Sequence, residues 1–176
     1  MRREELEHII RAAGAVTNED ELIIIGSQAV LGQFPDTTGL LCQSMEADII
    51  PIASPEKWNL IDGLLGEGSP FHETFGYYAD GVEEQTAILP LGWKERLIPI
   101  SNENTRGVVG RCLEIHDLLI SKYCAGRPKD REFTSEAVQR NMVKQALLLE
   151  RLKATELDAE LKEIVRSRIN GDFQRQ

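Results

Sequence analysis

The sequence predicts an α/β (α+β) fold in which a small mixed β-sheet with flanking helices precedes a helical C-terminal part. Residues 22–25 are Leu-Ile-Ile-Ile, and such an apolar, mostly β-branched run is typical of a strand buried on both faces. From about residue 111, apolar residues instead recur at helical spacing. A chain of 176 residues suits one domain, so we expect a sheet-bearing part over about 1–105 and a helical part over about 106–176.

Start and stop signals place the individual elements. Ser54-Pro55-Glu56 combines a capping hydroxyl, a proline and an acid at the positive end of the helix dipole, which predicts a helix start. Gly14 is a typical helix end, and Ser27 is a candidate N-cap. The predicted helices cover 3–13, 28–33, 54–65, 111–125, 134–153 and 156–169 (closed by Asn170-Gly171), and the predicted strands cover 22–25, 47–52, 77–80 and 96–100.

The charge of the chain disfavours one class of function. The formal net charge is −9 and the isoelectric point is near 4.9. Proteins gain affinity for nucleic acids mainly from Lys and Arg that neutralise phosphates, so a broad nucleic-acid-binding surface is disfavoured. A local basic pocket in an acidic protein suits a small phosphorylated ligand better than a long duplex.

The cysteines and the N-terminus predict a cytoplasmic location. The three cysteines are odd in number and show no CxxC spacing, which indicates reduced, partly buried thiols. The N-terminus lacks the apolar segment of a signal peptide, and no stretch approaches the roughly 18 apolar residues of a membrane span. We therefore expect neither export nor membrane insertion. The cysteines are Cys42, Cys112 and Cys124.

Gly26-Ser27 joins the first predicted strand to a helix. A glycine at this position lets a phosphate approach the backbone, and the free N–H groups at a helix start donate hydrogen bonds to an anion. An ordinary strand-to-helix turn also uses Gly and Ser, for reasons of geometry alone. Both interpretations remain open at this junction.

Two acids, Glu46 and Asp48, stand at the head of the second predicted strand. Side chains alternate along a strand, so both carboxylates lie on one face, roughly 6–7 Å apart. Such a pair suits Mg²⁺, a hard cation that binds carboxylates together with substrate phosphates. The alternative is a solvated strand entrance with two ordinary surface acids.

A basic cluster occurs in the second half of the chain. Lys122 lies one helical turn after Leu118 and therefore shares the inward face of its predicted helix. Lys122 and its basic neighbours form a group able to bind a triphosphate, although basic residues also gather at helix ends because of the helix dipole. Asp130 either orients Lys122 or Arg127, completes a metal site or caps the next helix. The basic neighbours are Arg127, Lys129 and Arg131.

These motifs resemble a known superfamily. A Gly-Ser turn followed by an acid-x-acid motif on the next strand resembles the signature of the nucleotidyltransferases, which have the DNA polymerase β-like fold. Residues 116–130, HDLLISKYCAGRPKD, resemble a DLxxSKxxAGRxKD segment of a prokaryotic nucleotidyltransferase-like group related to the AbiEii toxins. Residues 89–97 resemble another segment of that group, and the resemblance covers about 22–135. Glu46 stands where the superfamily usually has Asp.

The resemblance implies a single nucleotidyltransferase-like domain over 1–176 that moves a nucleoside monophosphate from a nucleoside triphosphate to an acceptor. It implies that Glu46 and Asp48 bind Mg²⁺ or Mn²⁺, and that Asp80 supplies a third carboxylate, although Asp80-Gly81 is also a standard turn pair. The implied catalytic residues are Asp48, Glu46, Lys122 and Asp130. The implied nucleotide-binding residues are Gly26, Ser27, Lys122, Arg127 and Lys129.

The sequence leaves the partners of this site open. The acceptor is an RNA end, a protein side chain or a small molecule. A different class of function is a non-catalytic nucleotide-binding or toxin–antitoxin-type interaction protein that keeps the fold with a weakened metal site. A homodimer and a complex with a partner protein are both compatible with the helical C-terminal part.

Overall fold

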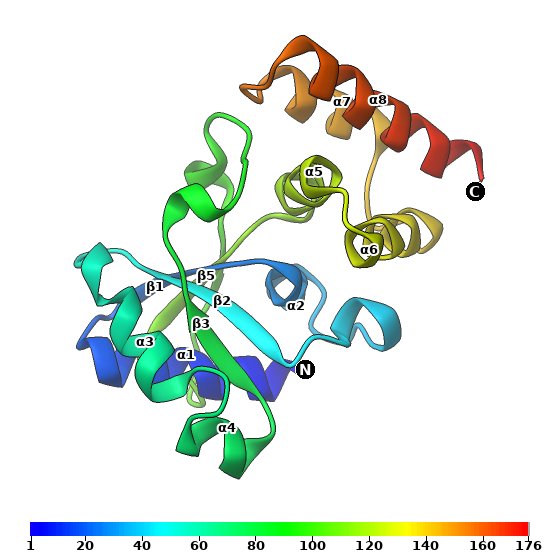
Figure 1. Ribbon diagram of the computed structural model, residues 1–176. Helices are drawn as coiled ribbons and strands as arrows, with labels where there is room; N and C mark the ends of the chain where they lie inside the picture. The colour runs from blue at the N-terminus through cyan, green and yellow to red at the C-terminus, as the bar shows by residue number, and fades with distance from the viewer. Residues whose placement is uncertain (176) are drawn as a thin grey trace.

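The computed structural model describes residues 1–175, and its centre is a mixed five-stranded sheet (Figure 1). The strand order is β3-β2-β1-β5-β4. β1 runs parallel to β5 and antiparallel to β2, β2 runs parallel to β3, and β4 runs antiparallel to β5. The predicted α/β class is therefore confirmed. The strands are β1 (Glu21–Ile25), β2 (Glu46–Pro51), β3 (Tyr78–Gly81), β4 (Ile98–Ile100) and β5 (Val109–Cys112).

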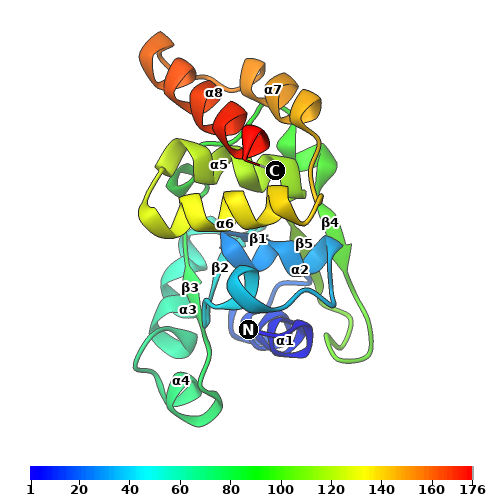
Figure 2. The same cartoon turned by 90° about the vertical axis from the view of Figure 1, so that its right-hand side faces the viewer.

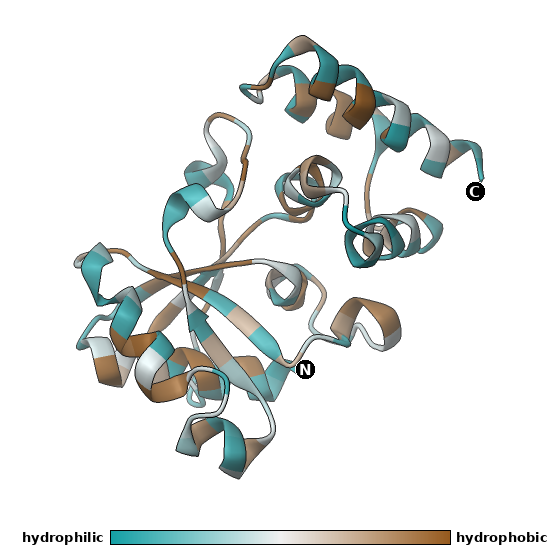
Figure 3. Ribbon diagram, viewed as in Figure 1, coloured by the Kyte–Doolittle hydropathy of each residue, from teal (hydrophilic) through white to brown (hydrophobic). Residues whose placement is uncertain are grey.

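Strand β1 occupies the middle of the sheet because its sequence is apolar on both faces. The run 22–25 is almost fully buried, as predicted, and β1 is hydrophobic along nearly its whole length in Figure 3. Helices α1 (Arg3–Thr17), α3 (Trp58–Leu65) and α4 (Pro70–Phe75) lie on one side of the sheet. The short helix α2 (Val30–Gln33) lies on the other side (Figures 1 and 2).

The helical C-terminal part lies beyond the same side of the sheet as α2 (Figure 2). Helix α5 is its core, since most of its side chains are buried and it packs against each of the other three helices. These helices are α5 (Ile115–Ala125), α6 (Pro128–Gln139), α7 (Gln145–Lys153) and α8 (Ala159–Gln174). Leu118 and Leu119 of α5 are at most 1% exposed, so this helix is held firmly against its neighbours.

Several predicted boundaries in the first half of the chain are wrong. Gly14 does not end the first helix: it lies against Val108, and the helix continues to Thr17, after which the C-cap Asn18 has the left-handed φ of 55°. Ser27 does not cap a helix, because Gly26 is the N-cap of a short 3-10 helix, Ser27–Ala29, that precedes α2. Helix α4 has a sequence signal that the prediction missed, a capping Ser69 followed by a proline.

The second half of the chain also departs from the predicted helices. Residues 109–112 form β5, although 111 and 112 were predicted to be helical, because they pair with the central strand β1. The predicted helix 134–153 is two helices, α6 and α7, separated near Asn141, whose φ is 58°. The predicted end at Asn170-Gly171 is wrong, since α8 continues through both residues. Parallel pairing and helix-on-helix packing therefore decided these boundaries.

The structure describes the burial of the cysteines and the length and polarity of the helices. All three cysteines are free, with Cys112 and Cys124 buried and Cys42 partly buried. Within residues 1–175, the helices are too short or too polar for any of them to cross a lipid bilayer.

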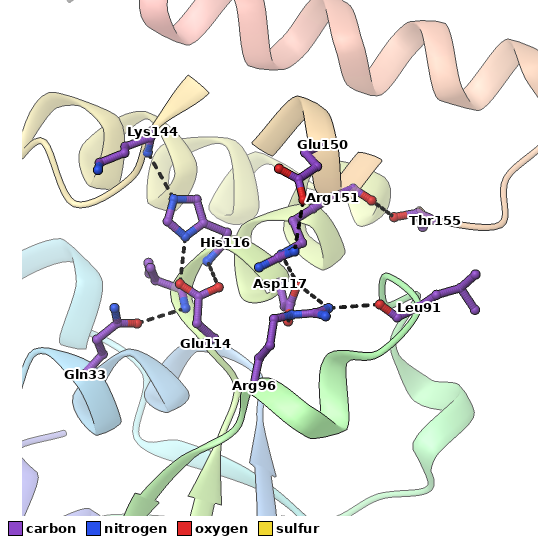
Figure 4. A network of polar contacts seen from close by, with 11 residues as sticks. Gln33, Leu91, Arg96, Glu114, His116, Asp117, Lys144, Glu150, Arg151 and Thr155 are labelled. Atoms are coloured by element: carbon purple, nitrogen blue, oxygen red, sulfur yellow. Dashed lines mark hydrogen bonds and ion pairs between the residues drawn. The ribbon is translucent and has the colours of Figure 1, made fainter. Parts of the chain in front are cut away.

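A buried ion-pair network ties α5 to the segment that precedes β4 (Figure 4). The fully buried carboxylate of Asp117 accepts two hydrogen bonds from Arg96, at 2.8 and 3.1 Å, and lies 3.3 Å from Nε of Arg151 in α7. Arg96 also donates to the carbonyl oxygen of Leu91. A buried carboxylate held by two guanidinium groups is rigid, so the network fixes the segment around 91–96 against α5.

Candidate functional site

A cavity of about 160 Å³ lies where β1 and β2 meet α5 and the start of α6. Segments that are far apart in the sequence form its walls. The lining residues are Ile25, Gly26, Glu46, Asp48, Thr86, Ala87, Leu118, Ser121, Lys122, Ala125, Arg127 and Asp130.

The acidic wall comes from β2. Glu46 and Asp48 both face the cavity, whereas Ala47 and Ile49 between and beyond them are fully buried in the core. Burial raises the pKa of Asp48 to about 6, and the charges of Glu46 and Asp80 add to that rise. The carboxylate of Glu46 accepts a hydrogen bond of 3.2 Å from the hydroxyl of Tyr78. The wall therefore concentrates negative charge in a partly desolvated place.

Gly26 brings the backbone of the β1 end against this acidic wall. In the antiparallel register Ile25 pairs with Asp48, so the next residue passes directly over that carboxylate. Gly26 has φ 68° and ψ −169°, a conformation that is essentially restricted to glycine. A Cβ atom at this position would lie 1.8 Å from Oδ2 of Asp48. The close approach therefore requires glycine on both steric and conformational grounds.

Lys122 supplies a buried cation on the opposite wall. Its ammonium group donates to the hydroxyl of Ser27 at 2.9 Å and to the carboxylate of Asp130 at 3.3 Å. The same nitrogen lies 4.4 Å from the ring centroid of Phe133, a favourable cation–π distance. Burial lowers the pKa of Lys122, and this effect outweighs the attraction of Asp130. The side chain is 7% exposed, so its direction is fixed by these partners.

Asp130 holds the two cations of the cavity together. It accepts hydrogen bonds from Nε of Arg127 at 2.6 Å and from a terminal nitrogen of the same guanidinium at 3.2 Å. Although burial alone raises the pKa of Asp130, the hydrogen bonds from Arg127 and the charge of Lys122 lower it overall. The side chain of Arg127 is 61% exposed, so it forms the rim of the cavity.

The predicted site residues are placed as follows. Ser27 reaches the cavity through its hydrogen bond with Lys122, and Lys129 is outside the lining, with Nζ 3.9 Å from Glu46. Asp80 pairs with Asp48 in the β2–β3 register but is absent from the cavity lining. Arg131 lies elsewhere, on another face of α6, and lines a separate cavity. The other predicted residues line the cavity themselves: Gly26, Glu46, Asp48, Lys122, Arg127 and Asp130.

A divalent cation has suitable donors here, although the chain does not enclose it. Within residues 1–175, no group of three His, Cys, Asp or Glu side chains is arranged to hold a metal ion. Glu46 and Asp48 do present hard oxygen donors to one cavity, where burial and then the charge of Glu46 raise the pKa of Asp48. Mg²⁺ commonly binds through one or two carboxylates, with water and substrate phosphates as its other ligands. The pair therefore fits Mg²⁺ or Mn²⁺ that arrives with a phosphorylated substrate.

Sequence reasoning missed the cavity wall formed by Thr86 and Ala87 and the hydrogen bond from Tyr78. The loop residues carry no motif, and only the folded chain brings them to the site. Ser121 was within reach of prediction, because it directly precedes Lys122 on the same helix. Tyr78 gave a weaker signal, as a polar aromatic residue at the start of the strand that ends in Asp80.

A model of the family described as nucleotidyltransferase of unknown function (DUF6036) matches residues 4–172. Among curated proteins, Mediator of replication checkpoint protein 1 of Schizosaccharomyces pombe is 33% identical over 63 residues, which are 36% of this chain and 6% of that protein. The chain thus spans a small part of that relative's length, and no solved structure matches the chain. Since the family model covers nearly the whole chain, the protein belongs to this family of nucleotidyltransferases.

Proposed function

We propose that the chain moves a nucleoside monophosphate from a nucleoside triphosphate to an acceptor hydroxyl at this cavity. The observation that carries the proposal is the meeting of an acid pair, Glu46 and Asp48, with a buried Lys122 across one small cavity. In the reaction, the acceptor oxygen bonds to the α-phosphorus and the bond to the α–β bridging oxygen breaks. Pyrophosphate leaves with that oxygen, and the hydroxyl proton passes to water.

The residues of the chain have distinct tasks in this proposal. The backbone at Gly26 and the cations Lys122 and Arg127 bind the phosphates, and Asp130 keeps the two cations in place. Fixed positive groups of this kind stabilise the charge that develops on phosphate oxygens in the transition state. Lys129, whose Nζ lies near Glu46, offsets negative charge of the triphosphate further from the reacting atoms.

Glu46 and Asp48 are the residues that would hold Mg²⁺ or Mn²⁺, with Asp80 as a neighbour that adds negative charge. When bound there, the cation polarises a phosphoryl oxygen of the substrate.

The proposal predicts a nucleotide-dependent gain in thermal stability. A triphosphate at about 100 times its dissociation constant should stabilise the fold by about 2.7 kcal/mol, or roughly 5–10 °C in Tm for a chain of this size. We expect this shift in wild type with Mg²⁺ for at least one of ATP, GTP, CTP and UTP. It should vanish with a chelator or in Asp48→Asn. An equal shift in Asp48→Asn would show that the nucleotide binds elsewhere.

A second candidate is a non-catalytic nucleotide-binding protein, with the toxin–antitoxin type of interaction that the AbiEii resemblance implies. The observation that favours it is the lack of a third converging metal ligand within residues 1–175. Such a protein would show the thermal shift with no release of pyrophosphate. It would also keep its protein partner when Asp48 is replaced.

A further inference from the structure

A second cavity of about 250 Å³ lies among α5, α6 and α8. Three arginines line it, namely Arg131 of α6, Arg168 of α8 and Arg175 just beyond α8. Among its lining residues, Asp172 is the only one that carries a negative charge. In a chain with a net charge of −9, a concave place with three guanidinium groups and one carboxylate is a marked local reversal of charge.

The carboxylate of this cavity is already satisfied. Asp172 is 6% exposed and accepts hydrogen bonds from the hydroxyls of Tyr123, at 2.8 Å, and Thr134, at 3.1 Å. It also forms an ion pair with Arg175. A carboxylate with three donors has a structural role, and it neutralises at most one of the three guanidinium groups.

Within residues 1–175, the other two arginines have no carboxylate partner. Arg168 donates to the carbonyl oxygen of Tyr123, near the C-terminus of α5. The side chain of Arg131 is exposed and has no hydrogen bond or ion pair with any residue in 1–175. Arginine presents a planar fork of N–H donors that matches phosphate oxygens, so the fork of Arg131 together with the remaining N–H donors of Arg168 favours a phosphate in this cavity.

The position of this cavity connects it with the proposed catalytic cavity. Lys122 and Asp130 line the catalytic cavity, and the residues that directly follow them, Tyr123 and Arg131, line the second one. Consecutive residues of a helix point about 100° apart, so the two cavities lie on adjacent faces of α5 and α6. Arg127 lies in the turn between these helices and is mostly exposed. Cationic groups thus continue from one cavity to the other.

We propose that the cavity of Arg131, Arg168 and Arg175 binds a phosphate group of the acceptor molecule. This inference rests on the proposed function, since it describes the second substrate of the same reaction. The phosphate belongs either to the backbone of a short single-stranded RNA or to a small phosphorylated molecule. A triphosphate in the catalytic cavity and an acceptor phosphate in the second cavity would place the two substrates on either side of the α5–α6 turn.

The test compares Arg131→Ala with Arg166→Ala, a control in α8 that removes the same charge from a partly exposed arginine paired with Glu163. Binding of inorganic phosphate is measured by calorimetry. Binding of a labelled single-stranded RNA of about ten nucleotides is measured by fluorescence anisotropy. We expect Arg131→Ala to weaken binding of at least one probe about tenfold, as for loss of one charge-assisted hydrogen bond, and Arg166→Ala to change it by less than about twofold.

The pattern of results separates the two proposals. RNA binding that depends on Arg131 identifies a nucleic-acid acceptor, and phosphate binding alone identifies a small one. Equal effects of the two substitutions on both probes, or no binding of either probe, would overturn the second site. The nucleotide-dependent thermal shift should persist in Arg131→Ala. If that shift is absent from wild type while phosphate binding depends on Arg131, the catalytic proposal fails and the second site stands.

Discussion

Asp48→Asn is expected to abolish nucleotidyl transfer and, at the same time, to make the folded protein more stable. The ionised carboxylate is partly buried beside Glu46 and Asp80, and its pKa is about 6 instead of the ordinary 3.8. This difference in pKa corresponds to about 3 kcal/mol in the free energy of unfolding at neutral pH. We expect Asp48→Asn to raise that free energy by an amount on the order of 1–3 kcal/mol. Transfer should fall by at least about a hundredfold, because the substituted amide is a poor ligand for a divalent cation.

The pH dependence follows from the direction of the shift in pKa. The folded state binds the Asp48 proton more tightly than the unfolded state, so this group stabilises the fold fully below about pH 4. That contribution is lost as the pH rises through about 6. The stability difference between Asp48→Asn and wild type should therefore grow between pH 4 and pH 7 and then level off. Urea unfolding in metal-free buffer with a chelator measures it.

Asp36→Asn provides the matched control for this prediction. It removes the same charge from an exposed residue outside the cavity, and it should change stability by less than about 0.5 kcal/mol at every pH. An Asp48→Asn protein that is less stable than wild type at pH 7, or that transfers nucleotides at the wild-type rate, would contradict the account of the acidic wall.

Gly26→Ala should be among the most damaging single substitutions in the chain. The new methyl group would lie 1.8 Å from Oδ2 of Asp48, and the backbone conformation at φ 68° and ψ −169° is strained for any other residue. Strain of this kind amounts to about 1–3 kcal/mol, and the overlap adds to it, so we expect a loss of about 3 kcal/mol or more. Transfer should be lost as well, because the Asp48 carboxylate must move. Urea unfolding and a transfer assay measure the two effects.

Gly68→Ala separates strain from overlap. Gly68 also has a positive φ, of 75°, but a Cβ atom there would meet nothing within 4 Å. We expect it to lose only about 1 kcal/mol. The overlap can also be removed from the other side: in an Asp48→Ala background, Gly26→Ala should be less damaging than in wild type. Additive effects in that double-mutant cycle would mean that the two residues are not in contact.

The part of the site that the sequence predicted comes from strong local patterns. An unbroken apolar run places β1 in the middle of the sheet, and strand alternation places Glu46 and Asp48 on one face. Helical spacing places Lys122 inward, and the structure buries it. The family match agrees with the superfamily resemblance that these residues carry. Each of these inferences depends on neighbours within a few residues.

The part that could not be predicted depends on contacts between distant segments. Strand β5 is only four residues long, and its strand character comes from pairing with β1. Thr86 and Ala87 reach the cavity because the Asp117 ion pairs hold the adjoining segment against α5. Arg131 was grouped with Lys129 from its position in the sequence. Three-dimensional packing puts it in a separate cavity with α8, a helix some thirty residues away.

The stability of this fold and its proposed activity make opposite demands on the same residues. Burial makes the charged form of both groups less favourable, since it raises the pKa of Asp48 and lowers the pKa of Lys122. Natural active sites commonly keep such groups because the chemistry requires them. Substitutions that neutralise the acidic wall should therefore separate stability from function, as Asp48→Asn is expected to do.

The most direct test of the central claim identifies the bond that is broken. Each nucleoside triphosphate, labelled at either the α- or the γ-phosphate, is incubated with the protein, Mg²⁺ or Mn²⁺, and RNA, protein and small hydroxyl acceptors in turn. Nucleotidyl transfer predicts that the α-label joins one acceptor and that the γ-label leaves as pyrophosphate, with both products absent in Asp48→Asn. Release of the γ-label as orthophosphate, or no product with any nucleotide and acceptor, would contradict the claim.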